Sequence, residues 1–185
     1  RVQWRAELEA PLTSFNSVGV LRGEEDVSVV ATDRRGRATG LSDSGEVVWQ
    51  FHTYRNGLGP AAIGDLDGDG RDEIVFSAGD AHIYCLGYDG SFRWAAQCDR
   101  GAQYSGPVLA DLGKGPCVMA GAEDDLVRCL SPEGKLLWTQ RGVGAGSVEI
   151  SLSVADIDGD GARELVYTHA GRAIQALDGN GRLLW

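Results

Sequence analysis

The sequence is poor in proline, and it lacks both long hydrophobic runs and helical periodicity. Only five of its 185 residues are proline, whereas 27 are glycine. This composition suits many tight turns without the three-residue period of collagen. No apolar run approaches the ~20 residues of a membrane-spanning helix, so we expect no membrane span. No segment shows a sustained 3.6-residue apolar period, so we expect no helix.

Basic residues are scarce relative to acidic ones. The chain has 17 Lys and Arg against 27 Asp and Glu, which gives a formal net charge of −10. This balance argues against a nucleic-acid partner, because phosphate contacts require clustered Lys and Arg. It suits cation binding or simply solubility.

The four cysteines lack metal-binding spacing. None belongs to a CxxC pair, so the sequence gives no zinc-site pattern. Cys85 and Cys129 each precede a tryptophan by nine residues, and we expect both to be buried thiols. Cys98 and Cys117 are the better candidates for a disulfide.

The tryptophans reveal an internal repeat. Five tryptophans lie 45, 45, 44 and 47 residues apart, at Trp4, Trp49, Trp94, Trp138 and Trp185. Each of the last four follows a glycine-containing turn and a short apolar strand, in the segments DSGEVVW (43–49), YDGSFRW (88–94), PEGKLLW (132–138) and GNGRLLW (179–185). Because every tryptophan falls at one phase of the repeat, we interpret them as packing residues between repeats rather than as a sugar platform.

Each repeat of about 45 residues is typical of four short strands, which predicts a β-propeller made of four-stranded antiparallel blades. A solenoid of hairpins is the alternative, but the repeat length and the tryptophan phase favour the propeller. The predicted single propeller arc over 1–185 divides into the last strand of a preceding blade (1–10) and four blades (11–53, 54–98, 99–141 and 142–185).

The strand count predicts an open arc rather than a closed ring. Four candidate first strands begin near Ser17, Pro60, Pro107 and Ile150, whereas there are five candidate last strands, because residues 1–4 match the end of a unit. We therefore expect further blades, either from a longer parent chain or from a partner chain. The chain has no signal peptide and no initiator Met, so we expect it to be processed or cut from something longer.

Two acidic loops occur at the same phase of alternate repeats, DLDGDGRDE (65–73) and DIDGDGARE (156–164). Each loop places three aspartates two residues apart and ends with a glutamate. The glycines between the aspartates allow a tight backbone turn. Clustered oxygen ligands suit Ca²⁺, whereas zinc prefers nitrogen or sulfur. We predict two Ca²⁺ sites, formed by Asp65, Asp67, Asp69, the carbonyl of Arg71 and Glu73, and by Asp156, Asp158, Asp160, the carbonyl of Ala162 and Glu164.

An EF-hand does not explain these loops. It requires a glutamate at loop position 12 and two flanking helices. Position 12 is Phe76 in one loop and Tyr167 in the other, and both lie in apolar strands. The third repeat has DLGKGPC (111–117) at this place and the first has VLRGEEDV (20–27), so we expect no site in either.

The segments AIGDLDGDGRDEIVF (62–76) and SVADIDGDGARELVY (153–167) resemble the FG-GAP, or VCBS, repeat. That family is the calcium-binding propeller blade of integrin α subunits and many secreted bacterial proteins. The resemblance implies that loop positions 1, 3, 5 and 9 supply side-chain ligands and position 7 a carbonyl. The blade ends, best shown by IQALDGNGRLLW (174–185), resemble the quinoprotein-like (PQQ-type) repeat.

Blade topology places the acidic loops, which join first and second strands, opposite the loops that connect one blade to the next. Function on a rigid scaffold concentrates in loops, and propellers commonly bind ligands on the face formed by these inter-blade loops. The turns between second and third strands, which hold Asp80, His82 and His169, lie on the same face, so we expect the ligand to contact both kinds of loop. The candidate ligand-binding residues there are Tyr54, Arg55, Asn56, Arg100, Gln103 and Tyr104. Aromatic, amide and arginine side chains suit sugars or acidic groups.

Three functions remain open from the sequence. The first is a calcium-stabilised, secreted or periplasmic module that binds carbohydrate or protein, favoured because no catalytic motif is present. The second is the propeller portion of a polysaccharide-degrading enzyme, since some rhamnogalacturonan lyases resemble this family. The third, a quinoprotein dehydrogenase, would need a complete ring and a cofactor on its axis. Fold resemblance alone does not choose among them.

Overall fold

The computed structural model describes residues 5–8, 11–12, 17–18, 21, 27–55, 57–102, 105–142, 152–169 and 173–185. Within these ranges the chain forms fifteen strands, all paired antiparallel, and no helix, which confirms the all-β prediction. It follows that the described part holds no helix able to span a membrane.

The strands form four successive sheets, which we call blades 1 to 4. Blade 1 consists of β1 (Ser17–Val18), β2 (Val27–Thr32), β3 (Arg37–Ser42) and β4 (Val47–His52). Blade 2 consists of β5 (Leu58–Gly64), β6 (Glu73–Ala78), β7 (His82–Leu86) and β8 (Phe92–Gln97). Blade 3 consists of β9 (Val108–Asp111), β10 (Pro116–Gly121), β11 (Leu126–Leu130) and β12 (Leu136–Arg141).

Blade 4 consists of β13 (Leu152–Ala155), β14 (Glu164–His169) and β15 (Ala173–Leu177). Its outer edge is completed by residues 183–185, because Leu183 bridges to Leu177 and Leu184 N–H donates to the Ala176 carbonyl at 2.9 Å. The four-strand prediction therefore describes this blade as well, although its last strand is reduced to a few pairings.

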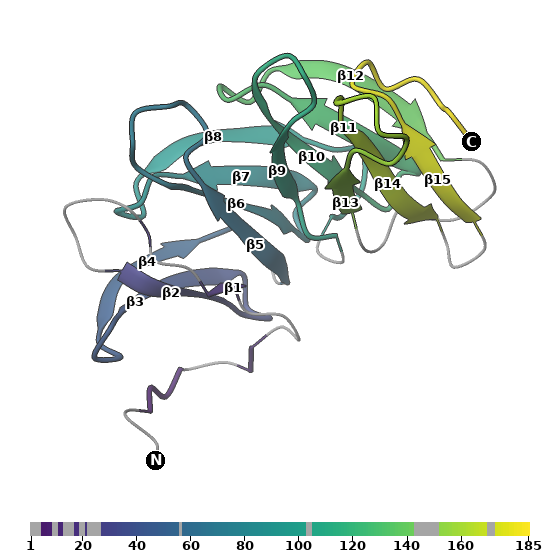
Figure 1. Ribbon diagram of the computed structural model, residues 1–185. Coiled ribbons are helices and arrows are strands. Elements are labelled where there is room, and N and C mark those ends of the chain that lie inside the picture. The colour runs from purple at the N-terminus through teal and green to yellow at the C-terminus, as the bar shows by residue number, and fades with distance from the viewer. Residues whose placement is uncertain are drawn as a thin grey trace.

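The blades stand side by side as an open, fan-shaped arc, with β1, β5, β9 and β13 neighbouring one another along the inside (Figure 1). Blades 1 and 4 lie at opposite ends. This arrangement is a partial propeller, as the repeat predicts. Residues 1–4, including Trp4, which the sequence assigns to the last strand of a preceding blade, lie outside the described residues.

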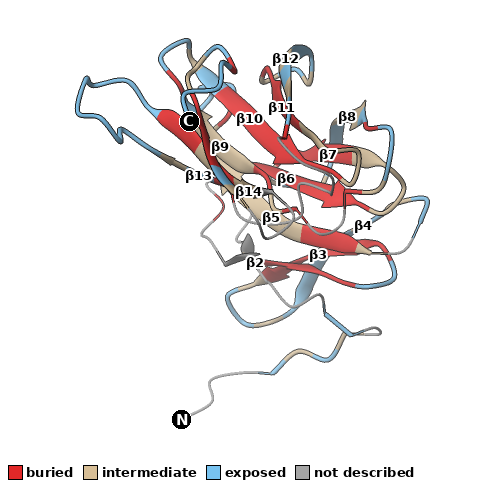
Figure 2. Cartoon of the chain, turned by 90° about the vertical axis from the view of Figure 1, so that its right-hand side faces the viewer, coloured by how far each residue is buried: buried red, intermediate tan, exposed pale blue. Residues whose placement is uncertain are grey.

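Three apolar cores hold the arc together, one at each junction between blades. Each core takes residues from both neighbouring sheets: Phe76 with Val30 at the first junction, Val75 with Val118 at the second, and Met119 with Leu165 at the third. The middle strands are buried, whereas β8 and β12 are largely exposed (Figure 2). A single blade could not bury both of its faces, so each depends on its neighbours.

The repeated tryptophans lock each blade to the next. The indole N–H of Trp49 donates to the Tyr88 carbonyl at 3.2 Å, that of Trp94 to Pro132 at 2.7 Å, and that of Trp138 to Gly179 at 3.2 Å. The ring also covers the glycine of that turn. At Gly134, where φ is +77°, a Cβ atom would lie 2.6 Å from the Trp94 ring. The structure thus gives these tryptophans the packing role that their phase predicts.

Of the two predictions about the cysteines, one is confirmed and one is wrong. Cys85 and Cys129 are buried thiols, as expected. The disulfide between Cys98 and Cys117 is wrong, since both are free thiols. Cys98 packs in the core between blades 2 and 3, whereas Cys117 packs in the core between blades 3 and 4. The two side chains therefore lie on opposite sides of blade 3.

Candidate functional site

The acidic loop of blade 2 connects β5 to β6, and its first aspartate organises the turn. One carboxylate oxygen of Asp65 accepts the N–H of Gly68 at 2.7 Å, and the other accepts the N–H of Gly70 at 3.0 Å. Both glycines have positive φ, +82° and +86°, which other residues adopt only under strain. The DxDGDG spacing is thus a folded turn with its carboxylates on one side.

The loop ends on a buried glutamate. Glu73 is 1% exposed, and its Oε2 accepts the Leu66 N–H at 2.9 Å. Its Oε1 is also buried and accepts no hydrogen bond of suitable geometry from the described residues, although it forms an ion pair with Arg93 Nη2 at 3.1 Å. Burial raises the pKa of the Glu73 carboxyl above its ordinary value, although the Leu66 N–H and the Arg93 guanidinium act in the opposite direction. A buried carboxylate of this kind requires a positive partner.

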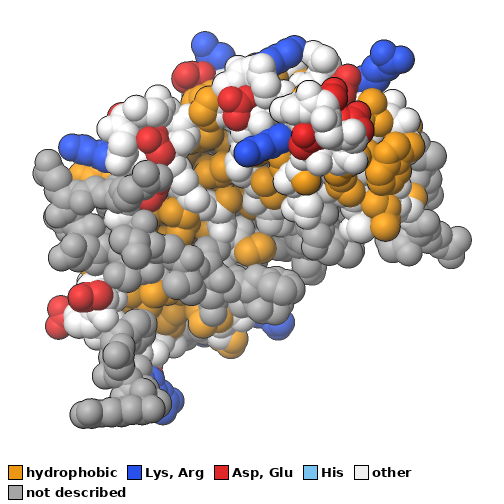
Figure 3. All heavy atoms as spheres, in the orientation of Figure 1, with side chains coloured by type: hydrophobic (Ala, Val, Ile, Leu, Met, Phe, Trp, Pro, Cys, Tyr) orange, Lys and Arg blue, Asp and Glu red, His pale blue; other side chains and the backbone are white. Residues whose placement is uncertain are grey.

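The loop of blade 4, between β13 and β14, repeats this construction. Asp156 accepts the N–H groups of Gly159 and Gly161 at 2.7 and 3.0 Å, and Glu164 Oε2 accepts the Ile157 N–H at 2.9 Å. Glu164 is 4% exposed. Acidic side chains gather over this loop on the face seen in Figure 3.

Three carboxylates converge in each loop. Ligand oxygens of Asp65, Asp67 and Glu73 all lie within 4.8 Å of one another, and so do those of Asp156, Asp158 and Glu164. Asp69 and Asp160 are not in these groups. Their carboxylates instead accept the N–H of Arg71 and of Ala162, each at 2.8 Å. The structure therefore brings together three of the four predicted side-chain ligands in each loop, and their hard oxygen atoms fit Ca²⁺.

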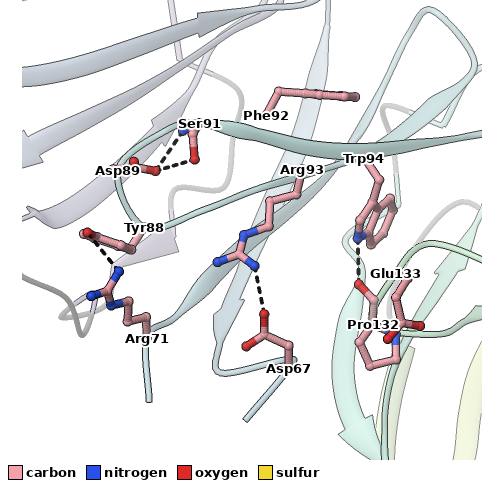
Figure 4. A pocket seen from close by; sticks show the side chains of 10 residues that line it. All are labelled: Asp67, Arg71, Tyr88, Asp89, Ser91, Phe92, Arg93, Trp94, Pro132 and Glu133. Carbon is pink, nitrogen blue, oxygen red and sulfur yellow. Dashed lines mark hydrogen bonds and ion pairs between the residues drawn. The ribbon is translucent and has the colours of Figure 1, made fainter. Parts of the chain in front are cut away.

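An arginine that the ligand prediction did not include enters the loop of blade 2. Arg93, on β8, places Nη1 2.8 Å from Asp67 Oδ2 (Figure 4). Its Nη2 lies 3.1 Å from Glu73 Oε1. A weaker approach joins Nη2 to Asp69 at 3.9 Å. The sequence did carry a signal, because Arg93 stands directly before Trp94, where the other described blades have Val48, Leu137 and Leu184.

A pocket of about 640 Å³ opens beside this arginine, between the turns of blades 2 and 3. Arg93 and Arg71 point into it, with Arg71 stacked over the Tyr88 ring at 5.1 Å (Figure 4). Phe92, which is 57% exposed, and Trp94 provide apolar walls. The acidic loops and this pocket share one face of the arc.

The candidate ligand-binding loops connect successive blades. Tyr54 is 93% exposed, and Arg55 and Arg100 are also exposed. Asn56, Gln103 and Tyr104 lie outside the described residues. The described members of this set are therefore accessible to a ligand, and their role in binding stays a prediction.

Aspartates from the next blade anchor these loops. Asp80 accepts the Tyr54 N–H at 3.2 Å, and Asp124 accepts the Asp99 N–H at 3.0 Å, directly before Arg100. Each of these carboxylates also holds a side chain four residues later. Tyr84 O–H donates to Asp80 at 2.6 Å, and Arg128 pairs with Asp124. The predicted binding loops therefore rest on a fixed base.

A family model described as the lambda-carrageenase beta-propeller domain matches residues 28–142. Lambda-carrageenase of Pseudoalteromonas carrageenovora is 27% identical over 169 residues, and a lambda-carrageenase of a Pseudoalteromonas species is 27% identical over 170 residues. Each alignment covers 90% of this chain but only 17% of the relative. The chain thus spans about a sixth of the length of these relatives.

Solved structures share the fold at low sequence identity. BamB from Moraxella catarrhalis superimposes with a TM-score of 0.75 at 19% identity, over 99% of this chain and 52% of that one. The V. cholerae biofilm matrix protein Bap1 superimposes with a TM-score of 0.69 at 20% identity, over 100% of this chain and 33% of that one. Both likenesses concern the fold alone.

Proposed function

This chain belongs to the lambda-carrageenase β-propeller domain family, and from that premise we propose that it is the carbohydrate-binding propeller module of a longer, secreted polysaccharide-degrading protein. The family match over residues 28–142 carries this proposal. It favours carbohydrate over protein as the ligand, and galactans over rhamnogalacturonan. Carrageenans are sulfated galactans, so the ligand class is an anionic polysaccharide. Exposed Arg55 and Arg100 supply guanidinium groups that suit sulfate.

We further propose that calcium stabilises blades 2 and 4 through loops of the FG-GAP type. The converging carboxylates support this assignment. A bound cation would neutralise acids that otherwise repel one another. Affinities of roughly 10⁻⁴–10⁻³ M, usual for extracellular modules, would suit a secreted protein. In this role calcium holds the turn, and the carbohydrate binds elsewhere.

We assign no reaction step to the arc itself. The titratable cluster of Asp80, His82 and Tyr84 lies beside the binding loops, with His82 Nδ1 3.5 Å from Asp80 Oδ1. Burial raises the pKa of the Tyr84 hydroxyl, as does its hydrogen bond to Asp80, so this tyrosine stays protonated at neutral pH. A protonated, buried tyrosine that holds a loop-anchoring aspartate serves structure. Catalysis by this cluster is the second candidate function.

Carrageenan binding by the 185-residue chain tests the proposal. Affinity electrophoresis in λ-carrageenan gels should retard the wild-type chain, whereas neutral agarose should not. Arg55→Ala combined with Arg100→Ala should weaken retardation at least tenfold. Because both side chains are exposed, the melting temperature (Tm) should not change. Arg5→Ala, another exposed arginine, is the matched control.

Two results would change this conclusion. Equal migration in both gels would contradict carbohydrate binding by this arc. Release of reducing ends from λ-carrageenan, lost on His82→Ala, would favour the catalytic alternative.

A further inference from the structure

The two acidic loops are nearly the same in sequence and in hydrogen bonding, but among the described residues only the loop of blade 2 has an arginine ion-paired to its carboxylates. In blade 2, Asp65 is engaged by backbone N–H groups, and so is Glu73 Oε2. The oxygens that remain for a metal include Asp67 Oδ2 and Glu73 Oε1. Arg93 contacts both of these atoms, at 2.8 and 3.1 Å.

Blade 4 has a leucine in the equivalent position. Leu184 precedes Trp185 as Arg93 precedes Trp94, and both lie on the outer edge of a blade. A leucine side chain brings no charge to Asp158 or Glu164, whereas a guanidinium adds a full positive charge to the loop of blade 2.

We propose that Arg93 is an internal counter-ion that competes with Ca²⁺ for Asp67 Oδ2 and Glu73 Oε1, so that blade 4 binds calcium more tightly than blade 2. This inference rests on the proposed calcium binding. For a metal to use these two oxygens, the guanidinium must leave them and give up two ion pairs. Its charge also repels the incoming cation.

The same contact has a consequence without calcium. Arg93 partly neutralises the buried Glu73, so the loop of blade 2 keeps its structure when the metal is removed. In the part of the chain that the structure describes, no guanidinium pairs with the carboxylates of the blade 4 loop, so we expect this loop to depend more strongly on the metal. The loop of blade 2 should therefore tolerate the removal of calcium, whereas the loop of blade 4 should require calcium to keep its structure.

Calcium titration calorimetry on single-site proteins tests this difference. Asp158→Ala leaves the site of blade 2, and Asp67→Ala leaves the site of blade 4. We expect the Asp67→Ala protein to bind calcium at least tenfold more tightly than the Asp158→Ala protein. Adding Arg93→Leu to Asp158→Ala should strengthen binding at least tenfold, and adding Leu184→Arg to Asp67→Ala should weaken it.

Arg93→Gln repeats the test with a polar side chain, in case Arg93→Leu does not fold. Arg35→Leu is the control for a general loss of positive charge, because it makes the same change at an exposed position in the β2–β3 turn, on the opposite face. It should leave both affinities unchanged.

Different results would contradict the competition by Arg93 and the calcium binding on which it rests. Equal affinities in the single-site proteins, unaltered by Arg93→Leu and Arg93→Gln, would overturn the competition while leaving calcium binding intact. Absence of calcium binding in every protein, including those without Arg93, would overturn the calcium sites themselves and the competition with them.

Discussion

The first turn of blade 2 and the corresponding turn of blade 3 hold the same kind of backbone with very different charge. Asp65 in blade 2 accepts two glycine N–H groups. Asp111 in blade 3 accepts three backbone N–H groups through Oδ1, at 2.7, 3.0 and 2.9 Å. One aspartate is therefore enough to hold the turn.

The later residues of each turn distinguish the two blades. Blade 3 adds Lys114, whose ammonium group bonds to Asn180 of blade 4. Blade 2 adds Asp67, Asp69 and the buried Glu73. These carboxylates also accept backbone N–H groups of the turn, but the turn of blade 3 forms without them, and together they would repel one another at neutral pH. The difference between the two turns supports the proposal that the acidic loops bind a cation.

Removing calcium should produce the largest difference between these blades. At a tenfold excess over Kd, each occupied site should stabilise the native state by roughly 1.4 kcal/mol, and two sites by roughly 2.8 kcal/mol. Asp67→Ala combined with Asp158→Ala should abolish this increment, measured by urea unfolding with and without EDTA. Asp111→Ala should retain it, because the described turn of blade 3 keeps only one of the carboxylates predicted to bind calcium. A wild-type unfolding curve that is the same in EDTA and in calcium would contradict structural calcium.

The effect of Glu73→Gln on stability should be smaller, and its sign should differ between EDTA and calcium. Burial raises the pKa of Glu73, so its ionised form costs folding free energy that appears as the pH rises above the ordinary value of 4.5. Glu73→Gln should therefore stabilise the protein in EDTA at pH 7 and destabilise it in calcium, each by about 1 kcal/mol, a common size for single substitutions.

Paired melts of the Glu73→Gln protein with and without calcium measure this reversal. Asp111→Asn, in the turn of blade 3, is the control and should show no reversal. Stabilisation or destabilisation of the same sign in both conditions would mean that Glu73 is not a ligand.

The fold and the position of the loops were predictable because they depend on local, repeated signals. Tryptophan at one phase and a glycine turn before it mark the contact between consecutive blades. The aspartate and glycine spacing of 65–70 needs no distant partner to form its turn. Each of these signals can be read within about ten residues of the chain.

Arg93 could not be assigned from such signals, because it lies twenty residues and two strands beyond Glu73. Its contact with the loop depends on the distance across a sheet from β8 to the β5–β6 turn, and on a side chain long enough to cover it. The sequence also could not show that Asp69, whose spacing matches a ligand, lies outside the group formed by the carboxylates of Asp65, Asp67 and Glu73. Pairing across a sheet, and the convergence of side chains, are decided only in three dimensions.

Truncating the first aspartate should show what the two turns share. Asp111→Ala removes the acceptor of three N–H groups and should lower Tm by about 3 °C, equally with and without calcium. Asp65→Ala should lower Tm by a similar amount in EDTA but by more in calcium, because it also removes a metal ligand. Thermal melts of both variants measure this, and an equal loss for both in calcium would remove Asp65 from the ligand set.

The smallest expected effect is the acid dependence of the turn of blade 3. Hydrogen bonds from the Gly113 and Gly115 N–H groups lower the pKa of Asp111 below its ordinary value of 3.8. A carboxyl with a lowered folded-state pKa stabilises the protein above that ordinary value and loses this contribution as the pH falls below it. Asp111→Asn keeps an oxygen acceptor but not the charge. The wild-type advantage over Asp111→Asn, about 1–2 °C in Tm at pH 7 in EDTA, should therefore shrink as the pH falls from 4 towards 2.5. An advantage that stays constant across this range would show that the carbonyl-like acceptor, and not the negative charge, holds the turn.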